Sequence, residues 1–264
     1  MKKYLILILS LVLAVTVLTA CGGNSSKSGN EVKDTFIVGF DKEFPPMGYV
    51  ADDGSFVGFD LDLAKEVADR LGYTLKLQPI SWSAKDMELE SGNVDVVWNG
   101  FTITEARKSE YTWTQPYMEN NQVVVVLKNS DITTLADVAG KSVAVQDDSS
   151  ALTAIEGNVA LKDSIGNLVK TQTNLNALME LESGAVDAVV MDEIVARFNI
   201  EKKGANYKVL DESVGAEVFG VGFKLGNTEL RDKVEATLLE MAADGKLAEI
   251  SESWFGKDIT IIGK

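Results

Sequence analysis

Residues 87–97 (MELESGNVDVV) return almost unchanged at residues 179–189 (MELESGAVDAV). Each copy predicts the end of a helix, a stop at a glycine and then a short apolar strand, because the left-handed position after a helix favours a residue without a Cβ atom. Gly92 and Gly184 are the predicted stops. The repetition indicates two similar lobes, although helix, glycine and strand also form a common local pattern that can arise twice independently.

The polar residues directly after each copy are the first candidates for a ligand site. In open α/β sheets, ligands bind beyond the carboxyl ends of the strands. Asn99, Gly100 and Thr102 follow the first copy, and Asp192 follows the second. If two similar lobes face one cleft, these residues approach it from opposite sides.

Strands and helices alternate in the pattern of an α/β protein. Apolar and β-branched runs predict strands at residues 36–40, 74–78, 123–127, 141–145, 168–171 and 218–224, and from residues 94 and 186. Helical spacing of apolar residues predicts helices at residues 59–71, 84–90, 150–156, 174–181 and 229–244. This order predicts two lobes, each with a mostly parallel sheet flanked by helices.

The chain is expected to pass between the lobes twice, in the strands 123–127 and 218–224, which together form a hinge. The first lobe then comprises residues 34–124 and 219–264. The second lobe, residues 125–218, is inserted into the first. This length of chain is sufficient for each lobe to have its own core.

Residues 1–20 predict a lipoprotein signal peptide. Two lysines precede an apolar run, residues 4–18, that is short for a membrane-spanning helix. Residues 18–21 (LTAC) resemble the bacterial lipobox, whose cysteine is lipidated and becomes the first mature residue. Cys21 is the only cysteine in the sequence, and a flexible tether is predicted at residues 21–33. A buried thiol is the alternative, but we expect an extracytoplasmic protein anchored by acyl chains such as palmitate.

The composition argues against several classes of function. A formal net charge of −15 disfavours nucleic-acid binding, which needs patches of lysine and arginine. The acidity suits solubility, and attraction of cationic solutes is a second interpretation. The chain has no histidine, which excludes Ser-His-Asp and Cys-His catalytic groups and a His-rich zinc site. We expect no cofactor and no metal ion.

Three segments resemble the polar amino-acid-binding proteins of ABC importers, which form bacterial solute-binding protein family 3. They are residues 39–47 (GFDKEFPPM), 53–64 (DGSFVGFDLDLA) and 99–107 (NGFTITEAR). The resemblance implies a two-lobed periplasmic-binding-protein fold without enzymatic activity. It also implies a monomer that closes on a free amino acid and delivers it to a membrane permease. In Gram-positive bacteria such proteins are lipoproteins, in agreement with Cys21.

Arg107 is the candidate partner for the ligand's α-carboxylate, because a planar guanidinium can bond both oxygens. Thr102 and the backbone N–H groups at the start of the predicted helix near Ser150 are expected to assist. The resemblance places the hydroxyl pair Ser149 and Ser150 at this end of the ligand. Residues 147–148 (Asp-Asp) stand where relatives often have a glycine, so the loop is expected to differ in shape or to add negative charge. An ordinary surface arginine is the alternative role for Arg107.

Asp192 is the candidate partner for the ligand's α-ammonium, assisted by the backbone C=O of Gly100 and the side chain of Asn99. A buried ammonium needs such a partner because an unpaired buried charge is costly. Asp192 can also cap the helix that follows it, and the two roles are compatible.

Phe44 and Trp82 match positions whose rings sandwich the ligand's side chain in the family, and a ring face also suits a cation. Asp41 lies near the expected end of that side chain. The acidic residues slightly favour arginine, lysine or histidine, although glutamine or cystine would use the same α-group partners. Asp60 and Asp62 are expected to be helix caps or surface residues.

Two other classes of function remain open. A cyclohexadienyl dehydratase-like enzyme would need an acid or base in the cleft, for which only Glu43 or Asp41 is available. A sensory surface lipoprotein could reuse the same lobes. No output domain follows residues 254–255, which favours delivery to a separate permease.

Overall fold

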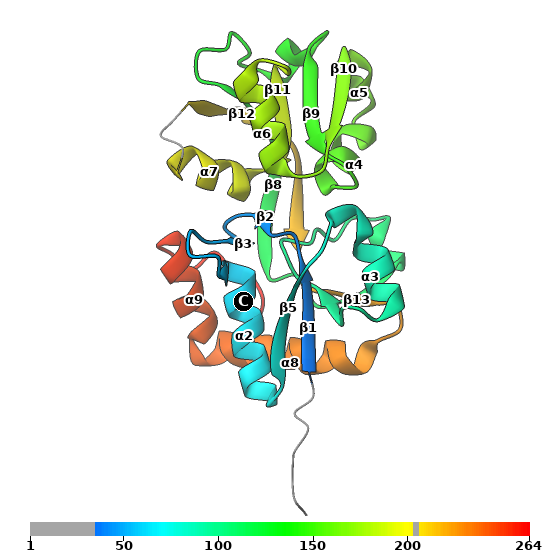
Figure 1. Cartoon of the computed structure of the whole chain (residues 1–264), viewed down its shortest axis with the longest axis vertical. Helices are drawn as coiled ribbons and strands as arrows, with labels where there is room; N and C mark the ends of the chain where they lie inside the picture. Colours follow the sequence, from blue (N-terminus) through cyan, green and yellow to red (C-terminus); the bar gives the residue numbers. More distant parts are fainter. Residues whose placement is uncertain (1–34, 203–205) are drawn as a thin grey trace, which may run out of the picture. The chain divides into compact units, whose positions relative to one another are not determined.

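Two five-stranded mixed sheets form the framework of the computed structural model, which describes residues 35–202 and 206–264 (Figure 1). We call the parts of the chain built around these sheets lobe 1 and lobe 2. In lobe 1 the strand order is β5-β1-β6-β13-β7, and in lobe 2 it is β10-β9-β11-β8-β12. The strands of lobe 1 are β1 (Thr35–Phe40), β5 (Thr74–Pro79), β6 (Val96–Val97), β7 (Tyr111–Trp113) and β13 (Gly222–Lys224). The strands of lobe 2 are β8 (Met118–Leu127), β9 (Ser142–Gln146), β10 (Asn167–Thr171), β11 (Ala188–Asp192) and β12 (Tyr207–Phe219).

Helices flank both sheets. Those of lobe 1 are α2 (Phe59–Leu71), α3 (Lys85–Ser91), α8 (Thr228–Asp244) and α9 (Lys246–Phe255), with the 3-10 turns η1 (Trp82–Ala84) and η2 (Arg107–Ser109). Those of lobe 2 are α4 (Ser150–Gly157), α5 (Val159–Ser164), α6 (Asn174–Ser183) and α7 (Glu193–Lys202), with the 3-10 turn η3 (Leu135–Val138). A small antiparallel sheet of β2 (Glu43–Phe44), β3 (Gly48–Val50) and β4 (Phe56–Val57) packs beside α2. Within the described ranges, none of the helices combines the length and apolar character that a membrane crossing requires.

Each sheet has a parallel centre and antiparallel partners. In lobe 1, β1 pairs parallel with β5 and β6, and β13 pairs antiparallel with β6 and β7. In lobe 2, β9 pairs parallel with β10 and β11, and β8 pairs antiparallel with β11 and β12. The two-lobed α/β prediction is therefore confirmed, with the parallel arrangement limited to three strands of each sheet.

The passages between the sheets lie at residues 114–117, before the expected crossing strand 123–127, and at residues 220–221, within the expected crossing strand 218–224. The expected strand 218–224 is in fact two strands: Val218 pairs with Glu119 in lobe 2, whereas Gly222 pairs with Val97 in lobe 1. Gly220, between the two strands, lies in close packing, because a Cβ atom at this position would lie 2.7 Å from the side chain of Ile103. Figure 1 shows β8 and β12 running together from lobe 2 toward lobe 1.

Both repeats form the structure that the sequence predicts. Gly92 ends α3 with a φ of 75°, and Gly184 ends α6 with a φ of 76°. Leu89 and Leu181, at equivalent positions, are buried under their helices at 3% and 1% exposure. The two helix stops are thus the same motif at the same burial.

An aspartate in each repeat fixes the strand that follows. The carboxylate of Asp95 accepts the backbone N–H of Ile37 at 2.7 Å, and that of Asp187 accepts the backbone N–H of Ser142 at 2.8 Å. Ile37 lies in β1 and Ser142 begins β9, the central strands of the parallel pairings. Each repeat is therefore tied to its own sheet in the same way.

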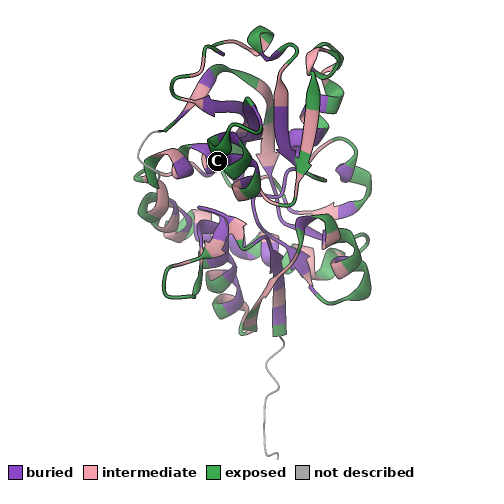
Figure 2. Cartoon of the chain, turned by 45° about the horizontal axis from the view of Figure 1, so that its top comes forward, coloured by how far each residue is buried: buried purple, intermediate pink, exposed green. Residues whose placement is uncertain are grey.

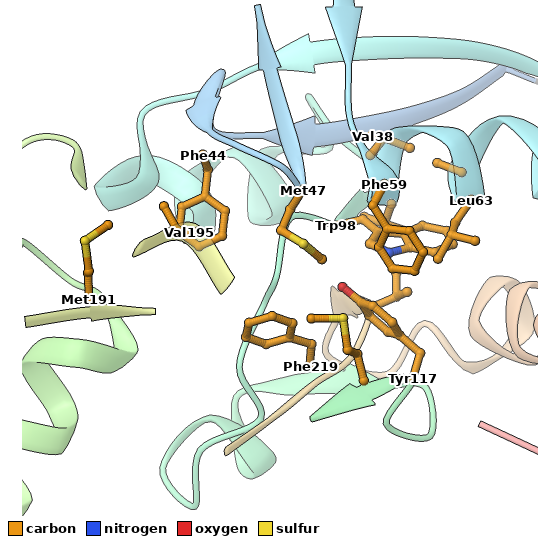
Figure 3. Close-up of a cluster of buried hydrophobic side chains, with 14 of the residues drawn as sticks. Val38, Phe44, Met47, Phe59, Leu63, Trp98, Tyr117, Met191, Val195 and Phe219 are labelled. Atoms are coloured by element: carbon orange, nitrogen blue, oxygen red, sulfur yellow. The ribbon is translucent and has the colours of Figure 1, made fainter. Parts of the chain in front are cut away.

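The strands carry the core, and the helices expose their outer faces (Figure 2). Amphipathic helices on both faces explain the burial of the strands. In lobe 1, side chains of β1 and α2 pack against Trp98 and Tyr117, and Figure 3 shows this cluster together with Phe44, Met191 and Phe219. The predicted signal peptide, Cys21 and the tether lie outside the described residues.

Candidate ligand-binding site

A small cavity lies between the polar residues that follow the two repeats. Residues of both lobes line it: Phe44, Trp82, Asn99, Gly100, Gln146, Ser149, Ser150 and Asp192. All of them except Gln146 are predicted site residues. The cavity has a volume of about 10 Å³, close to that needed by one water molecule, so an amino acid can enter only if the lobes separate.

The loop after β6 is held by a buried carboxylate. Gly100 has a φ of 57°, and its N–H donates to Asp60 Oδ2 at 2.6 Å. The Tyr117 hydroxyl donates to the same carboxylate at 2.9 Å. Asp60 is fully buried, and this burial raises its pKa to about 7. The expectation that Asp60 is a cap or surface residue is therefore wrong, whereas Asp62 is exposed as expected.

Gly100 is also required by close packing. A Cβ atom at this position would lie 2.9 Å from the Phe44 ring. Phe44 is 6% exposed and Trp82 is 8% exposed, and the Trp82 ring packs edge-on against Phe101 with centroids 5.3 Å apart. The two predicted aromatic residues therefore line the cavity with their rings held in place.

Arg107 is buried at the start of η2. It is 6% exposed, so the alternative of an ordinary surface arginine is wrong. Its guanidinium donates to the backbone O of Asp148 in lobe 2 at 2.9 Å and, more weakly, to the backbone O of Thr102 at 3.4 Å. It also lies 5.1 Å from the centre of the Phe101 ring. Arg107 thus reaches across the cleft to the loop that carries the two serines.

The two serines have different roles at the start of α4. Ser149 is the N-cap: its hydroxyl accepts the backbone N–H of Leu152 at 3.1 Å. The Ser150 hydroxyl bonds that of Thr102 across the cleft at 3.0 Å and accepts Gln122 Nε2 at 3.1 Å. Thr102 and Ser150 are therefore hydroxyl groups from opposite lobes that meet at one point.

Asp192 ends β11 with its carboxylate buried. The side-chain amides of Asn120 and Gln122 each donate to Asp192 Oδ1 at 2.9 Å. Burial and the neighbouring Glu217 carboxylate raise the pKa of Asp192 well above its usual range. Asp192 also directly precedes α7, so a contribution to the start of that helix is compatible with its position.

A chain of polar side chains crosses the cleft beside the aromatic rings. Gln146 Nε2 of lobe 2 donates to Asp41 Oδ2 of lobe 1 at 2.9 Å, and Asn174 Nδ2 donates to Gln146 Oε1 at 3.2 Å. Asn99 Oδ1 accepts the backbone N–H of Asp41 at 3.0 Å. All four residues are buried, and burial raises the pKa of Asp41. Asp41 thus does not line the cavity itself but accepts a hydrogen bond from Gln146, which does.

A second charged contact joins the lobes. The Lys85 ammonium at the start of α3 pairs with the Asp148 carboxylate, and the Lys85 side chain is only 2% exposed. Asp148 has a φ of 58°, so it adopts the left-handed backbone that a glycine would take easily. The two added charges of this loop are both paired, because Asp147 bonds Lys170 at 3.1 Å.

Sequence reasoning missed several residues of this region, among them Lys85, Asn120, Gln122, Gln146 and Glu217. Residues 119–122 (ENNQ), directly before the run of valines, did carry a signal. In a strand, residues two apart lie on one face, so Asn120 and Gln122 had to point the same way. In the described part of the chain, no group of His, Cys, Asp and Glu side chains is arranged to hold a metal ion.

The fold and the site define a two-lobed solute-binding protein with a polar cleft between the lobes. Residues 36–257 match the family model of bacterial extracellular solute-binding proteins, family 3, and the chain belongs to this family. It is similar to the L-cystine-binding protein of Escherichia coli (strain K12), with 31% identity over 88% of this chain and 87% of the relative. The arginine-binding extracellular protein of Bacillus subtilis (strain 168) is also 31% identical, over 97% of this chain and 98% of the relative.

Solved structures agree with these relatives. A substrate-binding protein of an ABC uptake transporter from Streptococcus pneumoniae, with histidine bound, superposes with a TM-score of 0.83 and 36% identity. The match covers 86% of this chain and 94% of that protein. The chain is therefore a substrate-binding protein of amino-acid transport by an ABC importer, and it is not an enzyme.

Proposed function

We propose that the chain captures a polar L-amino acid between its lobes, bound by the residues that line the cavity together with Asp41, Thr102 and Arg107, which the cavity lining does not include. The main support is that Asn99 and Gly100 of lobe 1 line the same cavity as a buried carboxylate of lobe 2, Asp192. An α-carboxylate and an α-ammonium are both costly to bury without a partner. A site with a buried guanidinium and a buried carboxylate on opposite lobes meets both needs.

Arg107 bonds the ligand's α-carboxylate in this proposal, with Thr102, Ser149 and Ser150 as neutral donors. Arg107 donates to the backbone carbonyl of Asp148, and Thr102 and Ser150 bond each other. A carboxylate is a better acceptor than a carbonyl for a guanidinium, because both partners are charged. The N-terminal N–H groups of α4 add a favourable dipole.

Asp192 bonds the α-ammonium, with the Gly100 carbonyl and Asn99 as further acceptors. The ligand's side chain then lies between Phe44 and Trp82 and points toward Asp41. A buried acceptor favours a side chain that donates hydrogen bonds, and a cation slightly more than a neutral group. Arginine, lysine, histidine or ornithine is thus the preferred ligand class, and a neutral polar amino acid such as glutamine or cystine is the second candidate.

Lobe closure is the proposed mechanism of capture. The lobes are connected by short passages at residues 114–117 and 220–221, and the contacts across the cleft form only when the lobes are together. A ligand that bonds Arg107 and Asp192 at once has higher affinity for the closed arrangement, and it therefore shifts the equilibrium toward closure. The closed protein then docks on the permease.

We further propose that residues 1–20 are removed and that Cys21 carries a lipid anchor, as in Gram-positive relatives. The tether at residues 21–33 would leave the two lobes free to reach the permease as a monomer. Mass spectrometry of the protein extracted from membranes tests this: a diacylated or triacylated peptide beginning at Cys21 is expected. An unmodified thiol at Cys21 would contradict it.

A thermal-shift screen tests the ligand class. The chain is unfolded and refolded to remove bound solute, then heated with each of the twenty amino acids, cystine and ornithine. A ligand that binds only the folded state raises the melting temperature by mass action. A shift with arginine, lysine, histidine or ornithine supports the preferred class, and a shift with glutamine or cystine alone selects the second candidate. No shift with any of them would overturn amino-acid capture at this site.

A further inference from the structure

Four polar side chains share one face of the lobe 2 sheet where Asp192 stands. Asp192 of β11 pairs with Gln122 of β8, and Glu217 of β12 pairs with Asn120, two residues earlier on β8. Because residues two apart on a strand point to the same face, the amides of Asn120 and Gln122 lie between two carboxyl groups. Strand β8, which lies between β11 and β12, thus brings Asp192 and Glu217 together from its two sides.

The amides bond both carboxyl groups at once. Asn120 Nδ2 lies 2.9 Å from Asp192 Oδ1 and 2.7 Å from Glu217 Oε1. Gln122 Nε2 lies 2.9 Å from each of the same two oxygens. These contacts bring Asp192 Oδ1 and Glu217 Oε1 next to each other, because the same two amide nitrogens bond both oxygens. Two ionised carboxylates in this position repel each other, and a proton held between them would remove that repulsion.

The surroundings favour holding that proton. Asp192 is only 4% exposed, and in the described ranges neither carboxyl group belongs to an ion pair with lysine or arginine. Two adjacent negative charges in a buried site cannot both be stable. The charged groups of the neighbouring elements have other partners or are exposed. Glu119 of β8 is exposed, and Glu193 of α7 bonds Arg197 and Asn121. Asp41 of lobe 1 bonds Gln146, and Arg107 bonds the Asp148 carbonyl.

We propose that Asp192 and Glu217 share one proton that the ligand's α-ammonium displaces, so that amino-acid binding releases a proton from the base of the hinge. This inference rests on the proposed function, in which Asp192 bonds the ammonium. The ammonium keeps its three N–H groups, the carboxyl O–H bond breaks, and the proton leaves to solvent. The pair passes from one negative charge to two, and the ligand's positive charge compensates the second.

The structure offers a route for that proton. Glu217 is partly exposed and lines a groove of about 840 Å³ beside the hinge, whereas Asp192 lines only the small cavity. Ser150 lines both hollows, and Thr102, which bonds Ser150, lines the groove. Glu217 therefore does not touch the ligand but connects Asp192 to solvent, which makes it a positioning residue.

Isothermal titration calorimetry in buffers of different ionisation enthalpy measures the released proton directly. The probes are L-arginine, L-glutamine and L-cystine at pH 5.5 to 7.5, and L-histidine is omitted because its imidazole titrates in this range. Each probe that binds the parent protein is expected to release close to one proton, with a dissociation constant that rises by up to about tenfold per pH unit on acidification. In Glu217→Gln, the glutamine side-chain oxygen can still accept hydrogen bonds from Asn120 and Gln122. The proton release and the pH dependence of the dissociation constant should both be lost in this variant.

The matched control is Glu119→Gln, which removes an exposed carboxylate opposite Val218 in the same strand pair and should behave like the parent. Binding without proton release in the parent would overturn the inference and leave the proposed function intact. Persistent release in Glu217→Gln would overturn the role of Glu217. If no probe bound at all, amino-acid capture would fail and the inference with it. The parent's pH series decides the question even if Glu217→Gln does not fold.

Discussion

The two repeats have the same local structure but lead to different chemistry. Each ends a helix at a left-handed glycine and anchors its strand through an aspartate carboxylate. After the first repeat, the strand stops at Val97 and the chain turns into a loop of backbone donors and acceptors. After the second, the strand continues to Asp192 and presents a carboxylate. The repeated sequence therefore determines where the helix ends, and the residues after it determine which polar groups lie at the end of the strand.

Asp60 of lobe 1 and Asp192 of lobe 2 are both buried carboxylates in this region, and the two are stabilised differently. Asp60 in lobe 1 accepts hydrogen bonds from two donors, the Gly100 N–H and the Tyr117 hydroxyl, and it holds the loop without reaching the cavity. Asp192 in lobe 2 lines the cavity and shares its amide donors with Glu217. One carboxylate holds a loop and the other lines the cavity. The comparison predicts that they respond differently to substitution.

The largest expected effect is the loss of ligand affinity in Arg107→Ala. Without the guanidinium, the ligand's carboxylate is buried with only neutral partners, which should cost roughly 3–5 kcal/mol of binding free energy, or more than a hundredfold in dissociation constant. Calorimetric titration with the strongest ligand of the thermal-shift screen measures this. Lys108→Ala is the matched control, because Lys108 is adjacent but exposed and bonds only Glu105. Parent-like affinity in Arg107→Ala would show that the carboxylate binds elsewhere.

Asp60→Asn should change the pH dependence of stability rather than ligand binding. The pKa of Asp60 is about 7 in the folded protein and near 3.8 in the unfolded chain. The folded state therefore binds more protons between these values, and its free energy of unfolding falls as the pH rises from about 4 to about 7. Asparagine cannot lose a proton, so the stability of the variant relative to the parent should improve by ~3 kcal/mol over this range.

Urea unfolding at a series of pH values measures that difference. Asp62→Asn is the control, because Asp62 lies on the same helix but is exposed, and its difference from the parent should be independent of pH. A constant difference for Asp60→Asn as well would mean that Asp60 stays ionised throughout, held by Gly100 and Tyr117.

Local signals explain which parts of this fold could be predicted. The helix over residues 59–71 has the predicted bounds because its apolar spacing and its glycine stop lie within one segment. The thirteen-residue strand β12 was not predicted over most of its length, because residues 207–217 (YKVLDESVGAE) lack an alternating apolar pattern. That strand forms because β8 offers a long partner, which no local pattern records. Propensity for strands depends strongly on such context.

The same limit applies to the site. The residues that follow the repeats could be found because strand ends and ligand sites coincide in α/β folds. Asp60 could not be recognised as buried, since its partners Gly100 and Tyr117 lie 40 and 57 positions away in sequence. The contacts of Glu217 are equally remote, as Asn120 is 97 positions away. Side chains whose role depends on distant partners were missed, whatever their own chemistry.

Lys85→Met tests the contact between the lobes with a smaller expected effect. Methionine keeps the length and the apolar stem of Lys85 but loses its pair with Asp148 across the cleft. Because this pair forms only between closed lobes, its loss should raise the dissociation constant by about tenfold, ~1.4 kcal/mol, mainly through faster release. Stopped-flow measurement of ligand release checks it. Lys65→Met is the control: it breaks a pair within one helix of lobe 1 and should leave the rate of ligand release unchanged. An unchanged rate in Lys85→Met would show that the pair of Lys85 with Asp148 does not contribute to closure.

Gly92→Ala and Gly184→Ala compare the repeats directly. The φ angles are 75° and 76°, and a Cβ atom would meet nothing within 4 Å at either position. The cost is therefore backbone strain alone, ~1 kcal/mol of unfolding free energy in each variant. Gly157→Ala, also in open space but without a left-handed φ, should lose nothing in the same urea unfolding experiment. Equal losses of unfolding free energy would mean that the repeated sequence determines where both helices end. A loss in only one variant would mean that the end of the helix in that lobe depends on the packing around it.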